Sequence, residues 1–348
     1  MKIRHLLLTA AAAALCCASG ASAQFVYMTS IDAGNSTFAR YDVANNQWTQ
    51  LTGIDTGAQM AVSTSGDLYA YRRGGGIQRY NPDDDSWTDV MVAPPGSSGS
   101  YGNLEITRDG EFLYTETNVR TLWYTDGGQW QTRPLPFGPN AMGDYDPTSH
   151  QYVVGEWTTG NAHMIKLSDF SVIDFTGSPG GNGERARHSV ILDGRYYFQY
   201  SSLAIHYYDL SNPGAPAVAA SAPYGAFYNS SAVDRGSGII YDYDLRTPGN
   251  FRSFDPGTGQ FTPLAAFNFA GNHSSIAFTG GAANCVYTLK KSKAKGGCDR
   301  CPPKGGDYRS EATCEDVKEC AKKVKTTIAC PGGGNGTCKL KGKRSSCG

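Results

Sequence analysis

An apolar or aromatic residue followed by tyrosine recurs along most of the chain, and this recurrence limits the possible fold more than any other feature. The tyrosines of successive copies lie 38 to 46 residues apart. A period in this range is typical of repeats that stack or radiate from an axis. The pairs are Val26-Tyr27, Leu68-Tyr69, Leu113-Tyr114, the weaker Gln151-Tyr152, Tyr196-Tyr197, Ile240-Tyr241 and Val286-Tyr287.

Each repeat has room for four short strands, and residues 60–91 illustrate this. Polar or glycine-rich turns, such as Gly74-Gly75-Gly76 and Asn81-Pro82, separate its apolar stretches. No part of the repeat region keeps an apolar period of 3.6 residues, so helices are not expected there. Four antiparallel strands per repeat predict the blade of a β-propeller. The strands expected in this unit are 60–63, 68–71, 77–80 and 87–91.

Aromatic pairs mark the third and fourth strands of several units. They are Tyr41 with Trp48, Tyr80 with Trp87, Phe254 with Phe261 and, as a shortened copy, Tyr124 with Trp130. We expect such large rings to fill the space between neighbouring blades. The pairs, set around turns such as Asn81-Pro82, resemble the kelch repeat over about residues 25–288. The resemblance implies a kelch-like β-propeller, although the glycine doublet of that repeat is present only at 74–76.

Six candidate inner strands predict six blades. They begin near Met60, Asn103, Met142, His188, Ser230 and Ser274. The first unit, 25–51, has three strands, and the last inner strand at 274–278 is expected to complete it and to leave no free sheet edge. Val286-Tyr287 is then a surplus strand, which keeps a seven-bladed alternative open.

The first 23 residues have the three parts of an export signal. Lys2 and Arg4 precede an apolar stretch at 6–17, and Ala21-Ser22-Ala23 fits the cleavage rule, so the mature chain is expected to begin at Gln24. No later apolar run is long enough to cross a bilayer. We therefore expect a secreted protein, extracellular or periplasmic, in an oxidising compartment.

Charge divides the chain although the formal net charge is zero. Residues 24–288 contain 14 basic and 25 acidic residues, whereas residues 289–348 contain 15 basic and 6 acidic residues. A uniformly basic nucleic-acid-binding protein is excluded. We expect a propeller at 24–288, a Lys/Gly linker at 289–297 and a basic, cysteine-rich domain at 298–348.

The eight cysteines of the mature chain all lie in its last 64 residues. This density predicts a small domain held by disulfides. Eight cysteines allow 105 pairings, so the connectivity stays open. A helix capped by Thr313 and reaching about Val324 is also expected there. The cysteines are Cys285, Cys298, Cys301, Cys314, Cys320, Cys330, Cys338 and Cys347.

The residues that begin the inner strands are expected to converge at one mouth of the central channel. A polar ring at a concave mouth is the first place to expect ligand binding. The predicted ligand-binding residues are Gln59, Asn103, Asn140, Arg187, His188, Asn229 and His273, with Asp144 adjacent. No cofactor or metal site is predicted, although Ca²⁺ could bind the clustered carboxylates of Asp83, Asp84 and Asp85. No catalytic motif accompanies the ring.

These patterns predict an exported, non-catalytic binding or adhesion protein. Its propeller would recognise an extracellular protein or glycan, and its basic tail would attach to an anionic surface polymer or dock on the acidic propeller. The alternative is an extracellular polysaccharide lyase or hydrolase with its site at the channel mouth. A third possibility makes the tail the partner-binding module and the propeller a spacer.

Overall fold

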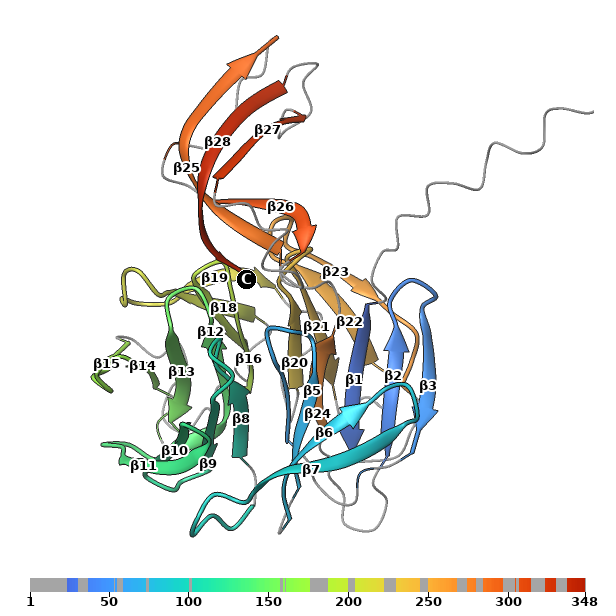
Figure 1. Ribbon diagram of the computed structural model, residues 1–348, viewed down its shortest axis with the longest axis vertical. Coiled ribbons are helices and arrows are strands. Elements are labelled where there is room, and N and C mark those ends of the chain that lie inside the picture. Colours follow the sequence, from blue (N-terminus) through green and yellow to red (C-terminus); the bar gives the residue numbers. More distant parts are fainter. Residues whose placement is uncertain are drawn as a thin grey trace, which may run out of the picture.

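The computed structural model shows a protein built from β-strands joined by turns and loops (Figure 1). Among its described residues, no helix is long and apolar enough to cross a membrane. The structure describes residues 24–30, 37–52, 54, 59–72, 75–99, 102–156, 159, 161–175, 187–199, 204–221, 230–244, 250–267, 274–279, 284–296, 304, 307–313, 323–329 and 337–347.

The strands form seven four-stranded antiparallel sheets, which we name A to G. Sheet A contains β24 (Ser274–Thr279), β1 (Phe25–Ser30), β2 (Phe38–Asp42) and β3 (Gln47–Leu51). Sheet B contains β4 (Gln59–Val62), β5 (Leu68–Arg72), β6 (Gly76–Asn81) and β7 (Ser86–Val92). Sheet C contains β8 (Gly102–Ile106), β9 (Phe112–Glu116), β10 (Thr121–Asp126) and β11 (Gln129–Pro134).

The next three sheets repeat the same order of strands. Sheet D contains β12 (Pro139–Asp146), β13 (Gln151–Glu156), β14 (Ala162–Lys166) and β15 (Val172–Asp174). Sheet E contains β16 (Arg187–Leu192), β17 (Arg195–Gln199), β18 (Ala204–Asp209) and β19 (Ala217–Ser221). Sheet F contains β20 (Ser230–Asp234), β21 (Ile239–Asp244), β22 (Asn250–Asp255) and β23 (Gln260–Pro263).

One edge strand from each of sheets A to F forms a closed ring. The contacts run from β4 to β8, β12, β16, β20 and β24, and then back to β4. The ring closes as the sequence predicts, because β24, from the far end of the repeat region, pairs with β1. The backbone N–H of Met60 donates to Ser275 Oγ at 2.9 Å, and each is the second residue of its strand, so the beginnings of β4 and β24 lie next to each other.

The apolar core is divided among the six interfaces between neighbouring sheets. Each of the six buried clusters draws its residues from two adjacent sheets. Between sheets A and B, Phe38 is fully buried and its ring lies 5.1 Å from that of Tyr80 and 5.2 Å from that of Trp87. Aromatic rings therefore fill the spaces between sheets, as the sequence predicts.

Three of the four aromatic pairs are direct cross-strand partners. Tyr41 is opposite Trp48, Tyr80 is opposite Trp87, and Phe254 is opposite Phe261. The fourth pair differs, because Trp130 lies opposite Thr125 and Tyr124 packs on Phe170 of sheet D. A two-residue turn at Gly127-Gly128, with both glycines at positive φ, shifts this hairpin by one position.

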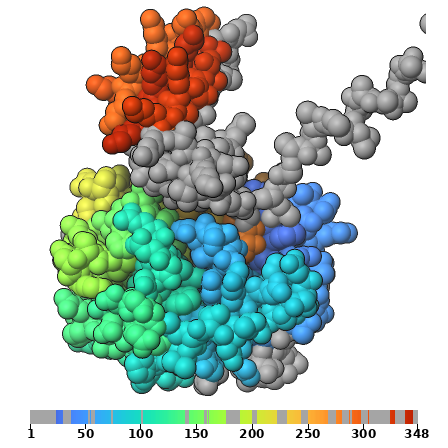
Figure 2. Space-filling model, viewed as in Figure 1, coloured from blue at the N-terminus to red at the C-terminus, as the bar shows by residue number. Residues whose placement is uncertain are grey.

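The C-terminal part forms sheet G, which lies outside the ring and appears as a separate orange-to-red lobe in Figure 2. Its strands, in order across the sheet, are β26 (Asp307–Thr313), β25 (Asn284–Lys295), β28 (Thr337–Cys347) and β27 (Lys323–Ala329). Val286 and Tyr287, the surplus strand of the seven-bladed alternative, pair with β26 and β28 in this sheet.

The structure differs from three expectations for the tail. The linker expected at 289–297 is strand β25 as far as Lys295, because ten residues of β25 find partners on β28. The expected propeller boundary at 288 also falls inside this strand. The helix predicted from Thr313 to about Val324 is contradicted at its end, because Lys323–Ala329 is strand β27. The rest of the predicted helix, residues 314–322, lies outside the described residues.

We predict that Phe38→Ala destabilises the protein by about 3–5 kcal/mol, because it empties the centre of the core between sheets A and B. Val92→Ala is the control, since Val92 is 74% exposed and its loss should change the free energy of unfolding by less than about 0.5 kcal/mol. Urea unfolding monitored by tryptophan fluorescence measures both. Equal effects of the two substitutions would contradict the packing described above.

The register of sheet G predicts one disulfide. Cys285 of β25 lies directly opposite Cys347 of β28. Opposite residues of antiparallel strands have Cα atoms about 4.5–5.5 Å apart, which is within the range that a disulfide spans. Peptide mapping of the oxidised protein without reduction should recover Cys285 joined to Cys347. Recovery of either cysteine joined to another one would show that the pairing is different.

Candidate functional site

The leading ends of the inner strands carry the residues that the sequence predicts at the channel mouth. Gln59 begins β4, Asn103 and Asn140 are the second residues of β8 and β12, and Arg187 with His188 begins β16. The ring of strand contacts places these ends around one axis. Side-chain positions are described for Gln59 and Asn103 in this set. Asn229 and His273 lie outside the described residues.

Gln59 has a buried acceptor without a hydrogen-bond partner. The residue is 6% exposed, and no described residue donates to its Oε1 atom. A buried, unsatisfied carbonyl oxygen costs free energy, so such a group is normally satisfied by water or a ligand. Gln59 is the first residue of β4, so this acceptor without a partner lies at the end of the inner strand where the sequence predicts the channel mouth.

Asn103 is held by a network that joins sheets C and D. Its Nδ2 atom donates to Tyr152 Oη at 3.1 Å and to Glu105 Oε1 at 3.2 Å. The Tyr152 hydroxyl also lies 2.8 Å from Thr115 Oγ1, and burial raises the pKa of Tyr152. Gly143 makes room for this network, because a Cβ atom there would lie 2.8 Å from the Val153 carbonyl and 3.1 Å from Asn103 Nδ2.

A buried charge cluster lies deeper along the same strands. Asp144 of β12 is 7% exposed and accepts hydrogen bonds from the backbone N–H groups of Tyr145 and Ile191. Arg235, in the turn after β20, places Nη2 at 3.2 Å from each carboxylate oxygen of Asp144. The same guanidinium donates to the carbonyl oxygens of Tyr145, at 3.1 Å, and Ile191.

Glu105, two residues after Asn103 on β8, completes this cluster. Burial raises the pKa of Glu105 well above its ordinary value, and the negative charge of Asp144 adds to the shift. Burial also raises the pKa of Asp144, while the positive charge of Arg235 and two backbone hydrogen bonds oppose that rise. The cluster is electrically balanced when Glu105 keeps its proton and Asp144 faces Arg235.

The cluster acts as a tie between sheets. Arg235 comes from sheet F, Ile191 from sheet E and Asp144 from sheet D, so one side chain joins three sheets. Asp144 was expected next to the channel mouth, whereas the sequence pattern did not indicate Glu105 or Arg235. Glu105 could have been found, because Asn103 and Glu105 must share a face of their strand. Nothing local to Arg235 indicates a partner 91 residues away.

Two of the three carboxylates in the acidic turn proposed as a calcium site accept hydrogen bonds within the protein. Asp85 accepts hydrogen bonds from the Thr52 N–H at 2.7 Å and the Tyr80 hydroxyl at 2.9 Å. Asp84 accepts one from Ser86 Oγ at 2.6 Å. In the described part of the chain, no three His, Cys, Asp or Glu side chains gather in a way that could hold a metal ion.

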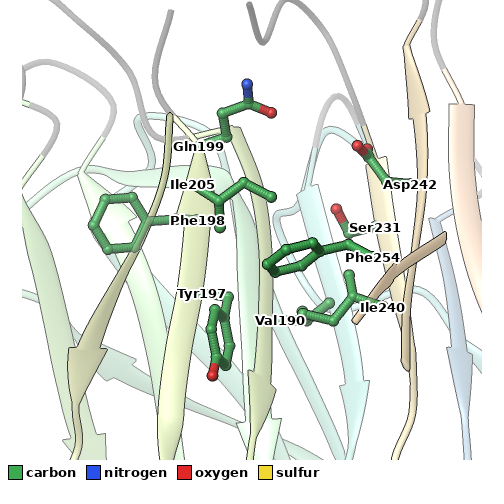
Figure 3. Close-up of a pocket in the computed structure, with 9 residues that line it drawn as sticks. All are labelled: Val190, Tyr197, Phe198, Gln199, Ile205, Ser231, Ile240, Asp242 and Phe254. Carbon is green, nitrogen blue, oxygen red and sulfur yellow. The ribbon is translucent and has the colours of Figure 1, made fainter. Parts of the chain in front are cut away.

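A cleft opens between sheets E and F, with about 290 Å³ of empty space that includes open solvent (Figure 3). Apolar side chains form most of its wall, and Gln199 and Asp242 lie near one end. Asp242 also accepts a hydrogen bond of 2.6 Å from Nε of the buried Arg252. The cleft is the open end of the core between these sheets. Its lining residues are Val190, Tyr197, Phe198, Gln199, Ile205, Ser231, Ile240, Asp242 and Phe254.

Comparisons with known proteins establish the fold alone. No family model matches the sequence, and no curated protein matches it. Among solved structures, a chain from the crystal structure of a nidogen/laminin complex is similar, with a TM-score of 0.58 and 11% sequence identity. The match covers 74% of this chain and 98% of that chain, which is a β-propeller. The repeated four-stranded sheets therefore form a propeller-like fold.

We predict that Glu105→Gln stabilises the protein near neutral pH and has little effect below about pH 4, the ordinary range of a carboxyl pKa. Because the pKa of Glu105 is raised in the folded state, the folded state binds more protons, and stability falls as pH rises from the ordinary carboxyl value to the raised one. The amide does not titrate, so the variant lacks this fall.

Urea unfolding midpoints between pH 4 and pH 8 measure the effect. The control is Asp109→Asn, which removes a carboxylate from an exposed turn. A difference between Glu105→Gln and the unsubstituted protein that stays constant over this pH range would show that Glu105 does not titrate in the expected direction.

Proposed function

We propose that the protein is an exported, non-catalytic binding or adhesion protein. Its body is a six-bladed, kelch-like propeller that recognises a protein or a glycan at the channel mouth. Its basic, cysteine-rich C-terminal sheet attaches to an anionic surface polymer. The observation that carries this proposal is the separation of an acidic ring-shaped body from a lysine-rich sheet that stands outside the ring.

The charge pattern supports a division of labour. In water, opposite net charges on two parts of one chain favour different partners for each part. The body has 25 acidic against 14 basic residues up to position 288, whereas 15 basic and 6 acidic residues follow. Sheet G projects away from the body in Figure 1, so its charges are presented to solvent.

The channel mouth supports recognition by the body. Gln59 offers a buried acceptor, and Asn103 is fixed by hydrogen bonds to Tyr152 and Glu105. Such pre-positioned polar groups suit hydroxyl and amide groups, which glycans and proteins both carry. The similar solved chain comes from a nidogen/laminin complex, in which a protein of this fold is solved with a protein partner.

The proposal that the protein is exported rests on its sequence. The basic start, the apolar stretch and Ala21-Ser22-Ala23 predict a signal peptide over residues 1–23, and the cysteine-rich tail suits an oxidising compartment. Mass spectrometry of the protein recovered from culture medium or periplasm should find an N-terminus at Gln24.

The enzymatic alternative places a polysaccharide lyase or hydrolase site at the same mouth. Of the carboxylates near it, Asp144 is already engaged by Arg235 and by backbone N–H groups. This use of its oxygen atoms favours a structural role. Release of unsaturated or reducing ends from a polysaccharide panel by the purified protein would support the alternative instead.

Ligand recognition at the channel mouth can be tested by first screening the mature chain, residues 24–348, for binding to arrays of glycans and extracellular proteins at high salt. We expect Gln59→Met to weaken binding of the selected ligand about tenfold, since it removes the acceptor and keeps the length of the side chain. Gln129→Met, at an exposed position on β11, is the matched control. Equal affinity of the two variants would place recognition elsewhere.

A further inference from the structure

The register of sheet G gathers lysines on one face. Directly opposite residues of antiparallel strands point to the same side of the sheet. Lys341 of β28 lies opposite Lys291 of β25 and also opposite Lys325 of β27. Other lysines that lie opposite these residues, or two positions away along the same strand, point to the same side. We call this set the lysine face. Its members are Lys291, Lys293, Lys295, Lys323, Lys325, Lys339, Lys341 and Lys343.

Exposure confirms that this sheet has two different faces. On β28, Cys338 and Leu340 are fully buried, while Lys339, Lys341 and Lys343, which alternate with buried positions, are exposed. The period of two is that of a strand with one face in solvent. All eight members of the lysine face are exposed.

No carboxylate neutralises these lysines from within their own strands. β25, β27 and β28 together contain nine lysines and one arginine and neither Asp nor Glu. Like charges in directly opposite positions destabilise a sheet. The pKa of Lys339 is lowered, chiefly by the positive charge of Lys295, with contributions from Lys325 and Lys293. The repulsion among these ammonium groups would be relieved by an anion placed over them.

The dimensions and composition of the lysine face indicate which class of anionic partner it fits. Strands lie about 4.8 Å apart and alternate residues about 6.7 Å apart, so the three strands present a charge lattice about 10 Å wide. No aromatic residue projects from it to stack on nucleic-acid bases, because Tyr287, the single aromatic of these strands, is buried. It also lacks the large apolar side chains that insert into a bilayer.

We infer that the lysine face binds a linear anionic polysaccharide that carries a carboxylate or a sulfate on successive sugars. A narrow, extended chain with regularly spaced charges fits a narrow lattice of regularly spaced ammonium groups. Lysine side chains act as adaptable point charges, which suits either anion and requires no fixed paired geometry. The inference rests on the proposed attachment role of the tail and names the partner of that role.

The position of the face leaves it open to such a partner. The beginning of β25 and the end of β28 adjoin the body, and β25 runs outward from there to the far part of the lobe (Figure 1). Cys285 and Cys347 pair at the inner end, and Lys295 is the last residue of β25. The lysine rows therefore lie toward the outer part of the lobe.

The experiment uses the mature chain and measures its affinity for polygalacturonate, dextran sulfate, neutral dextran and duplex DNA. We expect binding to both anionic polysaccharides, none to neutral dextran, and a linear fall of log K with log salt concentration. Substituting Lys293→Gln, Lys339→Gln and Lys341→Gln together should weaken this binding at least tenfold. The matched control removes the same charge from the body through Arg120→Gln, Arg133→Gln and Lys166→Gln.

Failure to bind either anionic polysaccharide, equal losses in the two triple variants, or duplex DNA bound at least tenfold tighter would overturn the inference. Circular dichroism of each variant establishes that it is folded. The Gln59→Met measurement at high salt is independent of the lysine face. If Gln59→Met weakens binding but the lysine-face variant does not, the proposed recognition by the body is supported and the polysaccharide role of the tail is contradicted.

Discussion

Packing of aromatic and aliphatic side chains between neighbouring sheets is the interaction on which the rest of the structure depends. A four-stranded sheet has two faces to cover, and each of sheets A to F covers both against its two neighbours. This requirement can be met for every sheet only if the sheets form a closed ring. Pairing of β24 with β1 completes the ring and leaves sheet A with four strands like the others.

The division of the core also explains the polar character of the channel. The large rings lie between sheets, as with Phe38, Tyr80 and Trp87. Four of the six inner strands, β4, β8, β16 and β20, contain no aromatic residue. Where the inner strands converge, backbone and side-chain groups of different sheets come within hydrogen-bonding distance. Arg235 uses this proximity to join sheets F, E and D, and Asn103 uses it to join sheets C and D.

The parts of the fold that the sequence predicts well are those set by local pattern. The strands expected at 60–91 match β4 to β7 within one or two residues, because turn residues bound each apolar stretch. The sequence pattern did not indicate the strand at 289–295, because its lysines and small residues have low strand propensity. It forms through pairing with residues 337–342, about 40 to 50 positions later, which the local pattern does not reveal.

The two kinds of charge in this molecule differ in how they are neutralised. In the body, Asp144 faces Arg235 and Asp242 faces Arg252, and such buried pairs must be matched because an isolated buried charge is too costly. In β25, β27 and β28, exposure to water allows nine lysines to stand without a carboxylate in the same strands. Water and salt reduce the repulsion among them but do not remove it. The two buried pairs of the body are therefore matched within the fold, whereas the lysine face would be matched by the external anion that we infer.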